Sequence, residues 1–227
     1  TDALGRSTSY QYDPANRLIQ LTEPLGRVTR YGYDAVGNRV VITDAMGGAT
    51  QFLYDAKDRL AQTIDPLGHA TTTTYDAVDN AIAVTDALSR TATFTHDALN
   101  RRVSASDPLG NITLYGFDAE GNRTSMRDAK NFSTAYVYDG LGRLVRVTDA
   151  LSGTVSYGYD AVGNRTMMTD ANGHVTTYTY DAVNRLKTVT DPIGFVTGYT
   201  YDAAGNRTTW TKPDGVVVNY AFDSLNQ

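Results

Sequence analysis

Residues 159–165 read Tyr-Asp-Ala-Val-Gly-Asn-Arg, and this phrase or a close variant returns every 21 residues along the chain of 227. The Tyr-Asp pair that opens it occurs at Tyr12-Asp13, Tyr33-Asp34, Tyr54-Asp55, Tyr75-Asp76, Tyr138-Asp139, Tyr159-Asp160, Tyr180-Asp181 and Tyr201-Asp202. His96, Phe117 and Phe222 replace the tyrosine in the other units, and no insertion interrupts the series. A fixed period of this length predicts a repeat architecture in which each unit packs on its neighbours.

The unbroken period leaves no change of composition at which a domain boundary could be placed. We therefore predict that residues 1–227 form a single continuous repeat array. The first residues match the back half of a unit and the last match the front half, and neither end carries a distinct polar capping unit. We expect the array to be a segment of a longer polypeptide or of a polymer, with further repeats at both ends.

Each unit, numbered from its tyrosine as position 1, divides into two turns and two strands. The first turn, at positions 2 to 6, starts with Asp and contains Gly or Asn, which tolerate a positive φ. The second turn, at positions 12 to 15, includes Asp65-Pro66-Leu67-Gly68, with Pro and Gly where a type I turn prefers them. A short strand is predicted at positions 7 to 11, and a longer one from position 16 to the next tyrosine.

The longer strand alternates threonine and aromatic residues, as in residues 176–180, so that its aromatic side chains share one face. The position-1 tyrosines form one aromatic column. The inner column contains Tyr10, Tyr31, Phe52, Phe94, Tyr115, Tyr136, Tyr157, Tyr178, Tyr199 and Tyr220, with Thr73 as its one lapse. We predict that these rings stack into two ladders, each ring burying about 150 to 250 Å², as the main stabilising element. Trp210 takes an apolar strand position, which predicts a core residue.

A second period of 42 residues lies within the first. It is visible at Arg17, Arg59, Arg101, Arg143 and Arg185, and at Asn38, Asn80, Asn122, Asn164 and Asn206. Odd-numbered units, counted from Tyr12, carry Arg at position 6, whereas even-numbered units carry Asn there, usually followed by Arg. Two chemically distinct environments should therefore alternate along the array.

The strand-rich pattern predicts an all-β fold, for which two architectures remain open. An antiparallel meander uses both turns as hairpin loops and gives about two strands per unit, and so long a strip must curl. A parallel β-solenoid with 21 or 42 residues per coil would also place equivalent residues side by side.

Charge and composition exclude several classes of function. A net charge of -5, with Arg and Asp interspersed in every unit, argues against a nucleic-acid partner. No apolar run is long enough to predict a membrane span, and the absence of cysteine excludes both a disulfide framework and a thiolate nucleophile.

No constellation of residues predicts a catalytic, cofactor-binding or metal site. The Asp residues at positions 2 and 12 could suggest Ca²⁺, but both start turns, where a carboxylate accepts backbone N–H groups. His69 and His174 share one turn position and His96 replaces a repeat tyrosine, without other ligands nearby in sequence. Five sequons, at Asn111, Asn122, Asn131, Asn164 and Asn206, arise mostly from the repeat itself.

Tyr-Asp followed by x-x-Gly-Arg or x-Gly-Asn-Arg, then a Thr-Asp-Pro-x-Gly turn and an aromatic-x-Tyr strand, resembles the YD repeat of the rearrangement-hotspot (Rhs) family. The resemblance covers the whole chain. It implies antiparallel β-hairpins joined into a strip that curls into a shell or superhelix, as in bacterial polymorphic toxins, Tc toxin complexes and teneurins, and it favours the meander.

The resemblance also implies a role. We expect a non-catalytic, structural wall of a secreted or cell-surface shell around a toxin cargo, or of an extracellular fibre. The alternative is an adhesive module that binds glycans or a protein receptor through exposed aromatic rings.

Overall fold

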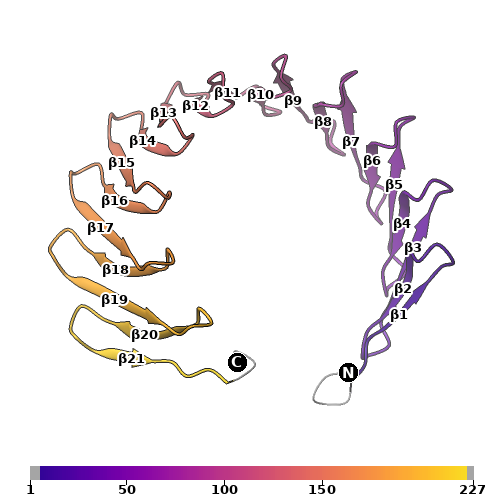
Figure 1. The fold of residues 1–227 in the computed structure, drawn as a ribbon. Coiled ribbons are helices and arrows are strands. Elements are labelled where there is room, and N and C mark those ends of the chain that lie inside the picture. The colour runs from indigo at the N-terminus through magenta and orange to yellow at the C-terminus, as the bar shows by residue number, and fades with distance from the viewer. Residues whose placement is uncertain (1–5, 224–227) are drawn as a thin grey trace. The chain divides into compact units, whose positions relative to one another are not determined.

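The computed structural model describes residues 6–223, which contain 21 β-strands and no helix (Figure 1). The predicted all-β fold is confirmed. No helix in this range is long and apolar enough to cross a membrane. The chain divides into two compact units, Thr1–Thr113 and Leu114–Gln227, each of which repeats the same hairpin.

The first unit contains ten complete strands. They are β1 (Ser9–Tyr12), β2 (Leu18–Thr22), β3 (Val28–Tyr33), β4 (Arg39–Thr43), β5 (Ala49–Tyr54), β6 (Leu60–Ile64), β7 (Ala70–Tyr75), β8 (Ala81–Thr85), β9 (Thr91–His96) and β10 (Arg102–Ser106).

The second unit repeats this alternation of five-residue and six-residue strands. Its strands are β11 (Ile112–Phe117, starting just before the boundary), β12 (Arg123–Arg127), β13 (Ser133–Tyr138), β14 (Leu144–Thr148), β15 (Thr154–Tyr159), β16 (Arg165–Thr169), β17 (Val175–Tyr180), β18 (Leu186–Thr190), β19 (Val196–Tyr201), β20 (Arg207–Thr211) and β21 (Val217–Asn219).

Within each unit, consecutive strands pair with one another in antiparallel fashion. In the first unit Tyr31 lies opposite Ile42, and Ile42 lies opposite Thr50 on the next strand. In the second unit Tyr178 lies opposite Val189, which lies opposite Thr197. Figure 1 shows the strands following one another in chain order, joined by short turns. The meander is therefore confirmed, and the parallel solenoid is wrong.

Both predicted turns form as hairpin loops with one residue in the left-handed region. In the first turn the Asp34 N–H donates to the Asn38 carbonyl at 2.9 Å, and Gly37 has φ 104°. In the second, the Asp44 N–H donates to the Gly48 carbonyl at 2.9 Å. Gly, Asn, Asp or Ser takes the left-handed place in every turn of the described range, because bulkier residues are strained there.

Each hairpin closed by a first turn contains a β-bulge. Tyr33 lies opposite Arg39 and Gly32 lies opposite Val41, so that Val40 is the extra residue of the shorter strand. The same irregularity recurs between Gly158 and Tyr159. A bulge increases local twist and redirects side chains, and here it lies where the position-7 side chain meets the rings of the longer strands.

The predicted core is absent, because no described side chain is fully buried in either unit. Most ladder rings are half-buried, and Tyr10 is 55% exposed. Trp210 is also half-buried and packs opposite Tyr199, with Lys212 over its ring at 5.2 Å. The prediction of a core position for Trp210 is wrong, since a single sheet has no second layer to cover its faces.

The rings of successive units are also not in direct contact as a stack. A short strand separates them, which places equivalent rings about 10 Å apart. In the second compact unit (Leu114–Gln227) an arginine lies between two such rings. The Arg165 guanidinium is 5.8 Å from the Tyr157 ring centroid and 4.8 Å from that of Tyr178. Where position 7 is arginine, the inner column therefore holds a guanidinium group between two aromatic rings, and cation–π attraction contributes to its stability. In most odd-numbered repeats leucine takes this place, as at Leu186.

Candidate functional site

Within each compact unit, the first turns lie side by side at the ends of the strands and carry the charged side chains that recur from repeat to repeat. In each turn the position-2 aspartate caps the loop. Asp160 Oδ1 accepts the backbone N–H groups of Val162 at 3.1 Å and Asn164 at 2.8 Å, while its Oδ2 accepts the Asn164 side-chain amide at 2.9 Å. The predicted use of these aspartates to bind turn backbone is confirmed.

The second turns use the same device. Asp65 Oδ1 accepts the N–H groups of Leu67 and His69, at 2.8 and 2.9 Å. Because these carboxylates already accept two or more hydrogen bonds, they are stabilised in the charged form. The side-chain hydrogen bond from Arg59 lowers the pKa of Asp55 to about 2.

In odd units the position-6 arginine reaches across to the next unit. Arg143 forms an ion pair with Asp139 of its own turn at 2.7 Å, and its Nη1 donates to the Asp160 carbonyl at 2.9 Å. Its guanidinium also lies 4.9 Å from the ring centroid of Tyr159. Arg17, Arg59 and Arg185 make the same contacts with the units that follow them.

In even units the shorter asparagine makes a different lateral contact. Asn80 and Asn164 donate to the side-chain oxygens of Asn100 and Asn184, each at 2.9 Å. Asn38 donates to Asp58 in the same way at 3.0 Å. The alternation of two environments, predicted from the 42-residue period, is confirmed, and its cause is the alternating length and charge of the position-6 side chain.

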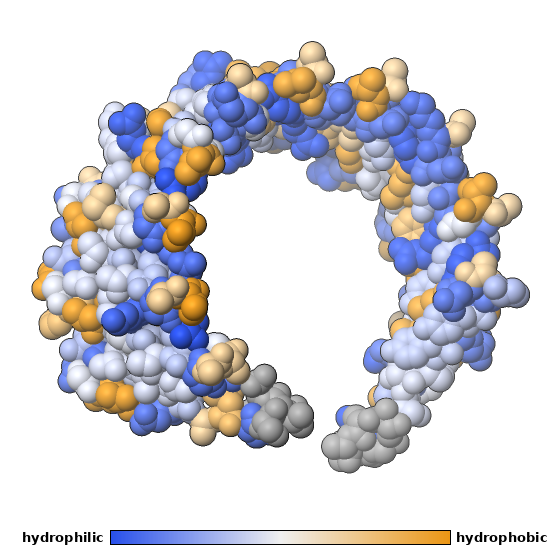
Figure 2. Space-filling view, in the orientation of Figure 1, coloured by the Kyte–Doolittle hydropathy of each residue, from blue (hydrophilic) through white to orange (hydrophobic). Residues whose placement is uncertain are grey.

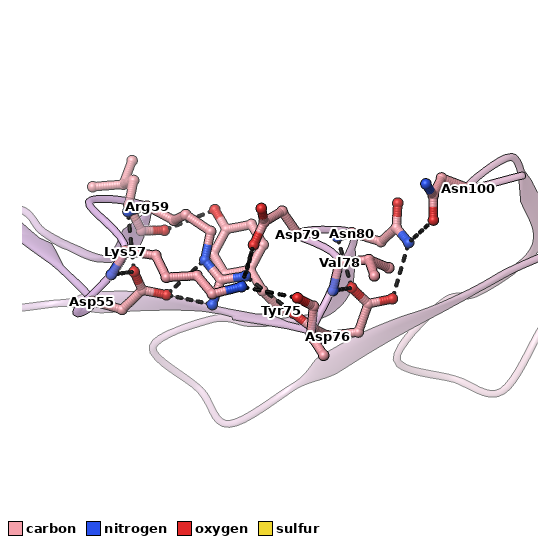
Figure 3. A network of polar contacts seen from close by, with 11 residues as sticks. Asp55, Lys57, Arg59, Tyr75, Asp76, Val78, Asp79, Asn80 and Asn100 are labelled. Atoms are coloured by element: carbon pink, nitrogen blue, oxygen red, sulfur yellow. Dashed lines mark hydrogen bonds and ion pairs between the residues drawn. The ribbon is translucent and has the colours of Figure 1, made fainter. Parts of the chain in front are cut away.

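Figure 3 shows this network across the first turns of three successive repeats in the first compact unit. Arg59 lies over the Tyr75 ring, and both Arg59 and Lys57 reach Asp79 of the next turn. From that same turn Asn80 extends toward Asn100. The polar side chains thus form a continuous chain of contacts from one repeat to the next.

Two contacts of this network were not predicted from sequence. The hydroxyls of the position-1 tyrosines donate to the main chain of the preceding unit, as from Tyr159 to the Leu144 carbonyl at 2.8 Å. The position-7 arginines, such as Arg165, lie between rings rather than against carboxylates. The signal was present, because Arg occupies position 7 mainly in even units, but only the bulge shows where that side chain points.

The histidines belong to the turns and the ring column. His69 Nδ1 lies 2.8 Å from Asp65 Oδ2, and His174 Nδ1 lies 3.0 Å from Asp170 Oδ2. The Nδ1 of His96 is buried and has no hydrogen-bond partner. Among residues 6–223 no group of three or more His, Cys, Asp or Glu side chains could hold a metal ion.

Most sequon asparagines use their side-chain amide nitrogen inside a turn. Asn111, Asn122, Asn164 and Asn206 donate to the aspartate four residues earlier, at 2.8 to 3.0 Å. Asn131 is exposed and occupies the left-handed turn position, with φ 66°. A glycan on Asn111, Asn122, Asn164 or Asn206 would require that asparagine to give up its side-chain hydrogen bond to the turn aspartate.

Comparison with known proteins agrees with this geometry. The family model described as RHS Repeat matches residues 1–27, 12–49, 33–70, 75–112, 138–175, 166–192 and 180–217. The chain belongs to the RHS repeat family. The RHS repeats therefore cover most of the sequence, as the Tyr-Asp phrase predicted. No curated protein matches the chain.

Solved structures share the fold of these RHS repeats. The structure of TcdB2-TccC3-Cdc42 matches all of this chain with a TM-score of 0.62 and 20% identity, over 16% of its own length. TcdB2-TccC3 matches 98% of the chain with a TM-score of 0.62 and 19% identity, over 15% of its length. TcdB2-TccC3 without its hypervariable C-terminal region gives a TM-score of 0.61. The chain thus spans about a sixth of the proteins it resembles.

The lateral arginine contacts between RHS repeats predict unequal effects of two superficially similar substitutions. Arg143→Ala removes an ion pair, a bond to the next repeat and a ring contact, and should lower the melting temperature of the full chain by about 5 °C. Arg90→Ala removes an arginine that is 61% exposed and pairs with Asp86 of its own turn, so the expected change is below about 2 °C. Equal effects in calorimetry would contradict a lateral role for Arg143.

Proposed function

We propose that this chain is structural wall material: one continuous RHS-repeat array within a shell that encloses a polypeptide cargo, without a catalytic role of its own. The observation that carries this proposal is the lateral network. First turns are tied to the next turn by Arg or Asn side chains, as at Arg143 and Asn164, and position-1 tyrosine hydroxyls bond to the preceding repeat. Such contacts make a wide sheet out of units that bury too little surface to be stable alone.

The absence of fully buried side chains in residues 6–223 fits the same role. A sheet one layer thick divides space into two sides instead of enclosing a core. Figure 2 shows separate apolar patches on a surface that is otherwise polar or of intermediate hydropathy. A wall that faces water or a loosely held cargo needs no continuous apolar face. We further propose that the protein is secreted or displayed at the cell surface, with further repeats continuing the array.

Imaging and proteolysis of the natural polypeptide that contains this chain test the enclosing role. Electron micrographs should show a hollow particle, and a segment inside it should resist protease until the particle is opened with denaturant. A solid fibre, or a row of separate globules, would refute the shell. Cell fractionation with an antibody against the chain should place it outside the cytoplasm.

The alternative function, an adhesive module, predicts a different result for the same protein. Saturable binding of a glycan or a receptor ectodomain by the intact particle, lost when exposed rings are substituted, would favour it. A screen without binding, together with a protected cargo, would favour the wall.

A further inference from the structure

The position-1 tyrosines fall into two classes according to what lies over their rings. Where the chain passes from an odd-numbered repeat to an even-numbered one, an arginine covers the ring. The distances to the ring centroid are 4.8 Å from Arg17 to Tyr33, 4.5 Å from Arg59 to Tyr75 and 4.9 Å from Arg143 to Tyr159. At the passage from an even unit to an odd one, the side chain at position 6 is asparagine, which is too short to reach. Within residues 6–223, no Arg or Lys lies over the ring of Tyr54 or Tyr138.

Grooves are present at two of these uncovered passages. In the second unit a groove of about 640 Å³ is lined by Asp118, Glu120, Asn122, Tyr138 and Asp139. In the first unit the groove beside Tyr54 has a volume of about 580 Å³ and is lined by Asp34, Asp55 and Asp58 among others. Both grooves therefore lie where the position-6 side chain is asparagine.

The groove beside Tyr138 is the more polar and open to a ligand. Elsewhere the even-unit asparagine is held by an acceptor on the next turn, such as Asn184 for Asn164. Gly142 occupies that place here and offers no side chain to Asn122. The Asp139 carbonyl accepts the Gly142 N–H at 2.9 Å. The equivalent carbonyl, that of Asp160, accepts the Gly163 N–H of its own turn and, in addition, the Arg143 guanidinium.

Charge in this groove is strongly negative. Asp118, Glu120 and Asp139 contribute three carboxylates to its lining, and Arg143 pairs with Asp139. The chain as a whole carries a net charge of -5. A planar cation placed over Tyr138 would gain attraction from the ring face and from the carboxylates together.

The protein itself shows how such a cation is held. One unit further along, Arg143 lies over Tyr159 and donates to the Asp160 carbonyl at 2.9 Å. We propose that the groove beside Tyr138 binds an arginine side chain of a basic polypeptide segment, with its guanidinium over the ring and donating to the Asp139 carbonyl. This inference does not depend on the enclosing role, because the groove is formed entirely by this chain.

A short peptide tests the proposal on the full chain. Acetylated and amidated Gly-Arg-Gly is titrated and followed by amide resonances of labelled protein, with Gly-citrulline-Gly as the neutral isostere. The arginine peptide should shift resonances around Tyr138 saturably, and the citrulline peptide should not. Glu120→Gln should weaken the arginine peptide by about two- to fivefold, the scale of one exposed charge pair. Glu23→Gln is the matched control. It changes the same kind of side chain in the first compact unit, away from the groove, and should leave binding unchanged.

The decisive variant supplies the missing arginine from within. Asn122→Arg converts an even unit to the odd pattern, so its guanidinium should occupy the groove, abolish peptide shifts at Tyr138 and raise the melting temperature. Equal binding of both peptides would overturn the proposal. So would binding unaffected by both Asn122→Arg and Glu120→Gln, and Glu120→Gln alone decides the matter if Asn122→Arg fails to fold.

Discussion

Tyr178→Ala is expected to lower the free energy of unfolding by about 2 to 3 kcal/mol, below the range for a fully buried aromatic residue. Sequence alone predicted about 3 to 5 kcal/mol for this change, on the assumption of a buried ring. Tyr178 is instead half-buried, lies opposite Val189, and has the Arg165 guanidinium 4.8 Å from its centroid. The alanine variant loses both contacts and exposes the neighbouring strand.

Denaturant unfolding of the full chain measures this effect. Tyr178→Phe is the matched control, since the inner column already contains Phe52 and Phe94, and it should change stability by less than about 0.5 kcal/mol. An unchanged midpoint for the alanine variant would show that the packing of the Tyr178 ring against Val189 and the Arg165 guanidinium contributes nothing to stability.

Acid should destabilise the protein strongly, because the turn carboxylates act together. Among residues 6–223, the pKa values of 15 aspartates lie below their ordinary value. They are Asp13, Asp34, Asp55, Asp65, Asp76, Asp79, Asp86, Asp97, Asp107, Asp118, Asp139, Asp160, Asp170, Asp181 and Asp202. At Asp160 the leading cause of the lowered pKa is the side-chain hydrogen bond from Asn164.

The direction of the effect follows from proton linkage. An unfolded aspartate takes up a proton near pH 3.9, at about its ordinary pKa, whereas Asp55 in the folded chain resists protonation until about pH 2. The unfolded state therefore binds more protons in this window, and stability rises with pH there. The stabilisation is complete above about pH 5 and is lost as the pH falls through 4 toward 2.

Melting curves between pH 7 and pH 2.5 test this expectation. The melting temperature should be flat from neutrality to about pH 5 and then fall steeply. Asp55→Asn should be less stable than the parent at pH 7, yet should lose less further stability on acidification, because one linked carboxylate is gone. A melting temperature independent of pH down to 2.5 would refute the role of the turn carboxylates.

Much of the fold could be read from the spacing of a few residue types. The turns were placed correctly because Asp, Gly and Asn stabilise a loop through contacts within five residues, such as those of Asp34 with Asn38. The strands followed from the alternation between these turns. The 42-residue alternation was also visible in the sequence, because Arg143 and Asn164 occupy equivalent positions with different chemistry.

Predictions that depend on distances between neighbouring repeats were less accurate. Rings were expected to stack directly and to be buried, but the strand between Tyr157 and Tyr178 keeps them apart and brings Arg165 between them. The grooves were not foreseen. The one beside Tyr138 depends on Asn122 lacking an acceptor on a turn 20 residues away in sequence.

The sequence by itself determined the all-β hairpin, its period and the family, because turn chemistry is local and the repeat multiplies each local signal. Only the tertiary structure decided which side chains reach the next unit, how far the rings are exposed and which tyrosines lie uncovered. These features depend on the bulge, on the spacing of about 5 Å between neighbouring strands and on the length of the side chains that cross it. None of these quantities can be read from the sequence of one repeat alone.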